Sequence, residues 1–244
     1  MKCWASEYGP CADGQSGEHL VSAALFTEPA VYVSGSLWGG SAPRRIGLNS
    51  LRSNTLCRHH NSLLSPLDQE AGRAFRALQD AFSLTVSRRR ARPRSWTVVR
   101  WTLDGSQLER WFLKTAVNFS AAAASPAWWA DPVDRVTAPL LNTIFTGTPL
   151  PFPAGLWAHL VPEATMSDED SVEFEALMAN GRHVGALFVF KGYRFLLWLT
   201  TLAHPAQHPA AKHLAALQYH TTAFNHVVAS RPSHVVQLTW RPAV

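Results

Sequence analysis

The segment Leu56–Asn61 brings a thiol, two imidazoles and a carboxamide into five consecutive residues. Within it, Cys57 and His60 have the C-x-x-H spacing that lets one tight turn present two ligands to a single ion. The other two cysteines of the chain, Cys3 and Cys11, could supply a second pair. Three thiolates and one imidazole suit tetrahedral Zn²⁺, so these residues predict a closed zinc site that ties the N-terminus to a point more than fifty positions later.

Two other interpretations of the cysteines stay open at the level of the sequence. Three cysteines in a chain of this length can be ordinary buried thiols. The seven residues between Cys3 and Cys11 exceed the two to four of a typical zinc knuckle, and these two thiols would form a disulfide in a secreted protein.

Composition favours a globular protein that works in a reducing compartment. The chain has 244 residues, of which 47% are hydrophobic, a net charge of +5 and a pI of about 9.4. No apolar segment follows Met1, and no stretch approaches the length of a membrane span, so we expect a cytoplasmic protein without a membrane partner. The positive charge is compatible with a polyanionic partner.

Glu18 and His19 form a second candidate site. A carboxylate beside an imidazole can act as a catalytic pair, because imidazole is the side chain best suited to accept a proton near neutral pH. Taken alone, the pair is better interpreted as two solvated side chains on a loop.

The order of these motifs is more informative than any one of them. Two early cysteines, a Glu-His pair, a glycine pair, a Cys-x-x-His-Asn motif and a downstream acidic residue resemble the HNH endonuclease superfamily, over Cys3, Cys11, Glu18-His19, Gly39-Gly40, Cys57–Asn61 and Leu67-Asp68. The resemblance covers about the first 70 residues. It implies a ββα-metal, treble-clef-like unit that hydrolyses phosphodiester bonds of nucleic acid, with DNA as the expected substrate.

The resemblance also assigns roles to individual residues. His19 matches the general base, and Asn54 (or else Asn49) matches the asparagine that orients it. Glu18 and Asn61 match the positions that hold a catalytic Mg²⁺ or Mn²⁺. The structural zinc positions fall on Cys3, Cys11, Cys57 and His60, where His60 replaces the usual second cysteine.

This sequence also departs from the HNH pattern. Ser22 replaces the proline after Glu-His, the loop before Cys57 is long, and Asn61 is a poorer metal ligand than histidine. These departures keep a second hypothesis open, namely a zinc-dependent module that binds nucleic acid or a protein without catalysis.

The sequence after the zinc motif predicts a helix, a basic linker and a second domain. Apolar residues at helical spacing predict a helix over Leu67–Leu84. Asp68 is expected to be a favourable carboxylate in its first turn, with a role as partner of a site residue as the alternative. An exposed linker over residues 87–94 is expected to contact phosphate through Arg88, Arg89, Arg90, Arg92 and Arg94. We therefore predict an HNH-like unit at 1–86 and an α+β domain of unknown role at 95–244.

Within the second domain, helices are expected at 106–123 and 132–145, with Pro139 kinking or dividing the latter. Strands are expected at 95–103 and 234–240. Runs at 172–178, 183–190 and 193–200, separated by Asn180-Gly181 and Lys191-Gly192, predict an antiparallel meander. The histidines between His204 and His226 are expected to be scattered on the surface.

Overall fold

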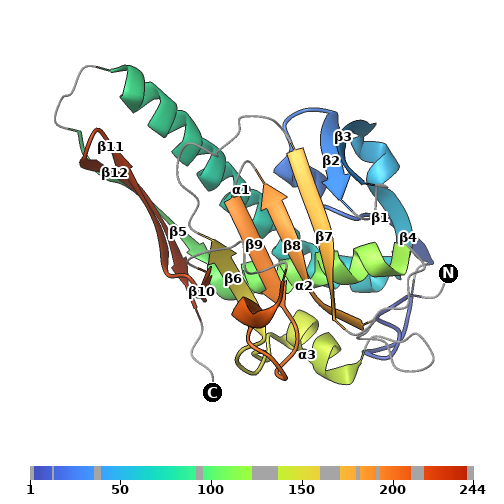
Figure 1. Ribbon diagram of the computed structural model, residues 1–244. Helices are drawn as coiled ribbons and strands as arrows, with labels where there is room; N and C mark the ends of the chain where they lie inside the picture. Colours follow the sequence, from blue (N-terminus) through green and yellow to red (C-terminus); the bar gives the residue numbers. More distant parts are fainter. Residues whose placement is uncertain are drawn as a thin grey trace.

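The computed structural model describes residues 3–12, 14–35, 40–91, 96–122, 137–159, 171–179, 182–190, 193–209 and 217–240. Within them the fold is mixed α+β, rich in strands (Figure 1). The helices in these described ranges are α1 (Arg58–Arg90), α2 (Gly105–Ala122) and α3 (Ala138–Thr146). Short 3-10 turns lie at Ala23–Leu25, Leu48–Leu51 and Pro205–Gln207.

The strands form three sheets. A two-stranded sheet contains β1 (Gln15–His19) and β4 (Arg52–Cys57). A seven-stranded sheet has the order β10-β6-β9-β8-β7-β2-β3. Its strands are β2 (Ala30–Gly35), β3 (Gly40–Gly47), β6 (Gly155–His159), β7 (Ser171–Ala179), β8 (Arg182–Phe190), β9 (Tyr193–Trp198) and β10 (Leu217–Tyr219). A three-stranded sheet contains β5 (Val99–Asp104), β11 (Ala223–Val228) and β12 (Arg231–Thr239).

The seven-stranded sheet contains the predicted meander. Strands β7, β8 and β9 pair antiparallel in sequence order, which confirms this part of the prediction. On the other side of β7 lies β2, paired in parallel with Tyr32 opposite Ser171. The sheet therefore crosses the boundary predicted at residues 87–94, and so does one continuous hydrophobic core.

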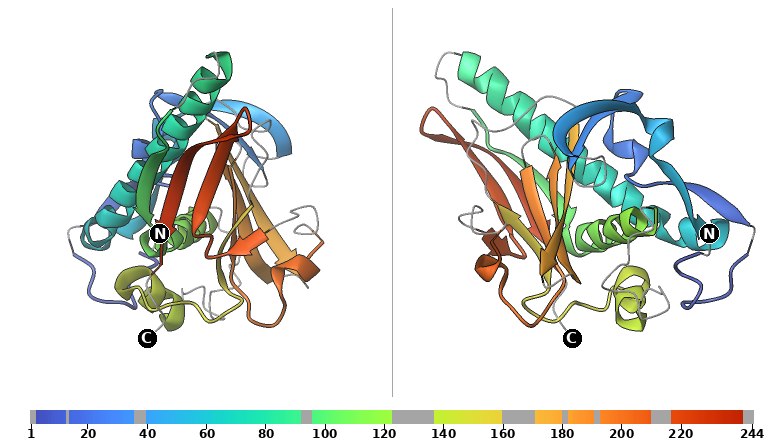
Figure 2. Two further views of the ribbon diagram at one scale, coloured as in Figure 1. Left: turned by 90° about the vertical axis from the view of Figure 1, so that its left-hand side faces the viewer. Right: turned by 45° about the vertical axis from the view of Figure 1, so that its right-hand side comes forward.

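The last strand joins a different sheet. β12 pairs antiparallel with β11 and in parallel with β5, with His234 opposite Val99. This three-stranded sheet lies along the C-terminal half of α1, as Figures 1 and 2 show from three directions.

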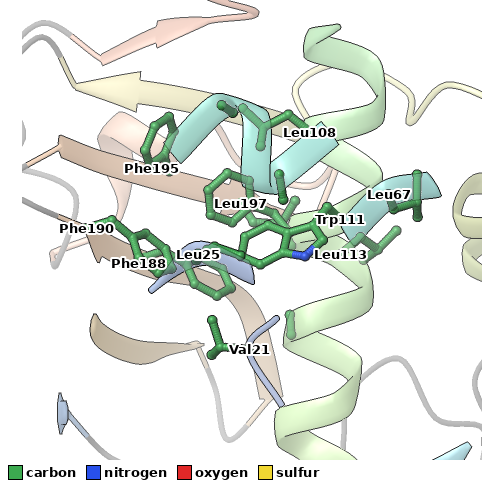
Figure 3. Close-up of a cluster of buried hydrophobic side chains, with 14 of the residues drawn as sticks. Val21, Leu25, Leu67, Leu108, Trp111, Leu113, Phe188, Phe190, Phe195 and Leu197 are labelled. Atoms are coloured by element: carbon green, nitrogen blue, oxygen red, sulfur yellow. The ribbon is translucent and has the colours of Figure 1, made fainter. Parts of the chain in front are cut away.

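The core lies between α1, α2 and the seven-stranded sheet. Trp111 and Phe112 of α2 are fully buried, and Phe188 on β8 lies 4.8 Å from Phe112 between ring centroids. Figure 3 shows Trp111 among side chains from the sheet and from Leu67 of α1. Because truncating such rings to alanine costs about 3–5 kcal/mol, this cluster fixes α2 against both neighbours.

Helix α1 is longer than predicted, and this corrects two expectations. It begins at Arg58 and continues through Pro66. Pro66 has no amide hydrogen to donate to the Ser62 carbonyl, the partner four residues earlier. The Ser65 hydroxyl donates to that carbonyl instead, at 3.0 Å. At the other end, Arg88–Arg90 belong to the last turn of the helix and not to a linker. Positive side chains are stabilised there by the exposed carbonyl groups of the helix end. Arg92 and Arg94 lie outside the described residues.

Other differences have local causes. α3 begins at Ala138, so Pro139 lies in its first turn, where no amide hydrogen is needed. The segment before Asp68 contains β1, β3 and β4, which the sequence did not reveal because they are polar or glycine-containing strands without clear alternation. None of the helices in the described ranges is long and apolar enough to cross a membrane.

Candidate metal centre and adjacent polar site

The predicted site residues lie where two antiparallel strands meet a helix. β1 pairs with β4, with Gln15 opposite Cys57 and His19 opposite Arg52. α1 starts directly after β4. This arrangement places the first residues of β1 beside the first turn of α1, so residues more than 40 positions apart in the sequence become neighbours.

The four predicted zinc ligands come together. Each of the four residues offers one ligand atom, namely a cysteine Sγ or a ring nitrogen of His60. These four atoms all lie within 4.8 Å of one another. His60 Nδ1 lies 3.2 Å from Cys57 Sγ, 3.4 Å from Cys3 Sγ and 3.9 Å from Cys11 Sγ. In a tetrahedral zinc site the nitrogen and sulfur ligands lie about 3.5 Å apart. The cluster could therefore hold a metal such as zinc, and its three thiols are free, not joined in a disulfide.

Backbone contacts hold this cluster together. Cys57 caps α1, and its Sγ accepts the His60 amide at 3.4 Å. The Trp4 amide donates to the Thr55 carbonyl at 3.1 Å, which ties the N-terminal segment to β4. The Trp4 indole donates to Asn118 Oδ1 on α2 at 2.9 Å. The cluster is thus anchored to α2 as well as to its own strands.

The environment of the thiols distinguishes them. Burial raises the pKa of Cys3 to about 12 and also raises the pKa of Cys11. Burial would raise the pKa of Cys57 too, but hydrogen bonds from the backbone of His60 and Ala12 and from the Cys11 and Cys3 side chains together lower it. Burial lowers the pKa of His60, which favours the neutral imidazole that a metal requires. Among the described side chains, His60 Nε2 is one of three buried polar atoms without a hydrogen-bond partner.

Glu18 and Asn61 are in contact. Glu18 is buried, and its carboxylate is hydrogen-bonded by Asn61 in the first turn of α1. Asn61 Nδ2 also donates to Ser16 Oγ at 2.9 Å. The other contact of Glu18 was not predicted: Lys114 Nζ on α2 lies 2.7 Å from Glu18 Oε1. Burial raises the pKa of Glu18, although the Lys114 ammonium opposes this shift.

Asp68 belongs to the same polar site, which corrects its predicted capping role. It lies ten residues after the start of α1, far from the exposed amides of the first turn. Lys114 Nζ donates to both of its oxygens, at 2.7 and 2.9 Å. The Trp111 indole donates to Asp68 Oδ1 at 3.2 Å, and the Ser22 hydroxyl donates to the same oxygen.

His19 lies at the edge of this site. Arg52 Nε donates to His19 Nε2 at 3.1 Å, so Nε2 carries the lone pair. Burial lowers the pKa of His19, and the Arg52 guanidinium lowers it further. Asn54 is exposed on β4, and Asn49 is exposed in the 3-10 turn before it. The orienting role predicted for Asn54 stays a prediction.

Arg88, one of the arginines predicted to contact phosphate, is engaged within the protein. Arg88 Nη1 donates to the Ser233 carbonyl at 2.6 Å, and Arg88 Nη2 donates to the Thr97 carbonyl at 2.9 Å. Its guanidinium also lies 4.9 Å from the centroid of Trp96. Arg88 therefore joins α1 to the three-stranded sheet, while Arg90 is exposed at the helix end.

The histidines of the C-terminal region are not all on the surface, contrary to prediction. His226 is buried and stacks on His234 at 4.2 Å between ring centroids. His220 Nε2 lies 2.9 Å from Glu109 Oε2, a carboxylate contributed by α2. The pairing of His220 with Glu109 could not be predicted from the sequence, because the two residues lie 111 positions apart.

Sequence reasoning missed Lys114 and Arg52, the two cations that contact the predicted catalytic residues. A lysine inside the apolar stripe of a helix was the available signal for Lys114. Comparison with family models, curated proteins and solved structures finds no match to this chain.

Proposed function

We propose that the chain is an HNH-like, metal-dependent endonuclease in which a structural zinc at Cys3, Cys11, Cys57 and His60 supports the site. The observation that carries the proposal is the contact between Glu18 on β1 and Asn61 in the first turn of α1, while His19 lies at the edge of this site. A nuclease of this kind requires Glu18 and Asn61 to converge, whereas an unrelated loop pair would leave them apart.

The donor set is suited to Mg²⁺ or Mn²⁺. Magnesium is usually held by one or two protein oxygens and keeps several waters. Glu18 offers a carboxylate oxygen, and Asn61 would offer its carboxamide oxygen after its side chain turns, because its Nδ2 faces Glu18 and Ser16 in this structure. Such an ion, when bound, supplies a Lewis acid that stabilises charge on the scissile phosphate.

The remaining chemistry falls to the protein. Burial and the Arg52 guanidinium lower the pKa of His19, which favours its neutral form. Its Nε2 lone pair accepts from Arg52 Nε in this structure, and it would take a proton from the attacking water once Arg52 turns to the phosphate. Arg52 lies beside that nitrogen, and its guanidinium is suited to a phosphate oxygen. The hydrogen bond between Arg52 and His19 supports this assignment of a base beside a phosphate ligand.

Charge distribution supports a nucleic-acid substrate. Residues 1–100 contain 13 Lys or Arg and 7 Asp or Glu, a net charge of +6, which leaves −1 for the remainder of the chain. Exposed arginines on this part include Arg44, Arg45 and Arg58. Positive charge on the part of the chain that carries the site favours a polyanionic substrate, with DNA proposed ahead of RNA.

The test is cleavage of supercoiled plasmid by zinc-loaded protein with Mg²⁺ or Mn²⁺. Replacing His19 with alanine should lower the rate about 10²–10⁴-fold, the usual contribution of a general base. The matched control is His59→Ala, because His59 is an exposed histidine outside the site. Equal cleavage by the wild type and His19→Ala would refute the assignment of the base.

A second candidate is a zinc-dependent nucleic-acid-binding module without catalysis. The ion pair between Lys114 and Glu18 favours it, because an ammonium already neutralises the proposed metal ligand. This candidate predicts salt-dependent DNA binding by folded, zinc-loaded protein together with no cleavage by any variant.

A further inference from the structure

The ammonium of Lys114 lies between two carboxylates that come from separate parts of the chain. Its Nζ is 2.7 Å from Glu18 Oε1 and 2.7 Å from Asp68 Oδ2. Because both oxygens lie 2.7 Å from the same nitrogen, they are at most 5.4 Å apart. Opposite ligands of an octahedral Mg²⁺ lie about 4.2 Å apart, so this pair of carboxylates is close to the span of a divalent-ion site.

This ion pair is part of the interior. Lys114 is 1% exposed and Glu18 is 6% exposed. One turn before Lys114 on α2, Trp111 Nε1 donates to both Asp68 Oδ1 and Ser22 Oγ. The same face of α2 therefore carries both the indole that holds Asp68 and the ammonium of Lys114. The ammonium is fixed in the interior and does not move freely into solvent.

The charges of the group leave little attraction for another cation. Two carboxylates and one ammonium sum to −1, and Asn61 adds no charge. Affinity for divalent ions rises with the number of charged ligands, and an adjacent ammonium repels them.

We infer that Lys114 is a built-in cation that occupies the carboxylate pair of Glu18 and Asp68 and keeps the affinity of this site for divalent ions low. The inference deepens the proposed function and rests on it for the role of the site. A divalent ion must compete with Lys114, and Asp68 becomes a second carboxylate available to that ion when the ammonium is absent.

The test is Mn²⁺ binding to zinc-loaded, full-length protein, measured from the electron paramagnetic resonance signal of free Mn²⁺. Lys114→Gln should bind one Mn²⁺ per chain at least about tenfold more tightly than the wild type, because both carboxylates lose their ammonium. The matched control is Arg73→Gln. Arg73 lies on α1, where it pairs with the buried carboxylate of Glu70 at 2.7 Å. Its replacement removes one positive charge, as Lys114→Gln does on α2, and should leave Mn²⁺ binding unchanged.

A second variant covers the case in which Lys114→Gln does not fold. Lys114→Gln combined with Asp68→Asn keeps hydrogen-bonding groups at both positions and restores a net charge of −1. It should bind Mn²⁺ more tightly than the wild type and, where both can be measured, less tightly than Lys114→Gln. If the folded Lys114→Gln protein binds Mn²⁺ no more tightly than the wild type, the inference is overturned. If that variant does not fold, the same result in the double variant overturns it.

The readout separates this inference from the proposed nuclease. Tighter Mn²⁺ binding without plasmid cleavage by any variant would retain the role of Lys114 and remove the nuclease. If cleavage depends on His19 but the Mn²⁺ affinity does not change in Lys114→Gln, the nuclease would be retained and the role of Lys114 removed.

Discussion

Replacing His60 tests the metal centre most directly. His60 is fully buried, and its Nδ1 lies 3.2–3.9 Å from the three cysteine sulfurs. Structural zinc binds with roughly 10–16 kcal/mol in small domains, so one ligand of four accounts for roughly 2.5–4 kcal/mol. We therefore expect His60→Ala to weaken zinc binding roughly 60- to 1,000-fold.

The assay is competition for zinc with a chromophoric chelator, followed by thermal unfolding of the zinc-loaded proteins. His59→Ala is the matched control, because His59 is the exposed neighbour and not a member of the cluster. His60→Cys should retain zinc, since a fourth thiolate can complete the tetrahedron. If His60→Ala binds zinc as tightly as His59→Ala, the proposed zinc site is refuted.

Two further predictions concern stability. Arg88→Ala should lower the free energy of unfolding by about 2–3 kcal/mol, because charged hydrogen bonds to the Ser233 and Thr97 carbonyls are lost. Arg90→Ala should change it by less than about 0.5 kcal/mol in the same urea titration, and equal effects would contradict a joining role for Arg88. Burial, with His226 and Arg88 nearby, lowers the pKa of His234 to about 3 from 6.5. The unfolded chain therefore takes up this proton first, and stability should fall as pH drops below about 6.5, by roughly 2 kcal/mol at pH 5. His234→Gln should flatten this dependence, and an unchanged pH profile would contradict the assignment.

The cluster of candidate metal ligands could be predicted because its signal is local and chemical. Cys57 and His60 lie on one turn, and only two other cysteines exist to complete a set of four. The meander was equally accessible, since alternating apolar residues over β7, β8 and β9 specify antiparallel neighbours joined by short turns.

Parallel pairings were not accessible in the same way. Tyr32 meets Ser171 and His234 meets Val99 across more than 130 residues in each case. No turn sequence encodes such pairings, because they depend on which exposed edge remains after local hairpins form. For the same reason the sequence did not reveal that β2 extends the sheet that contains β7, β8 and β9.

Lys114 shows why the chemistry of the site could be predicted only in part. The helix that carries it presents Leu108, Trp111 and Phe112 as a broad apolar stripe, and a lone lysine there is normally expected to reach solvent. Its burial follows from the fold, because α2 is covered by the sheet on one side and by α1 on the other. Burial of an ammonium is tolerated only with charged partners. Glu18 and Asp68 were each identified from the sequence, but as a metal ligand and a helix cap. Only the position of α2 makes them one anionic pair, so the factor that sets the cation preference of the site lies outside the motif that predicts the site.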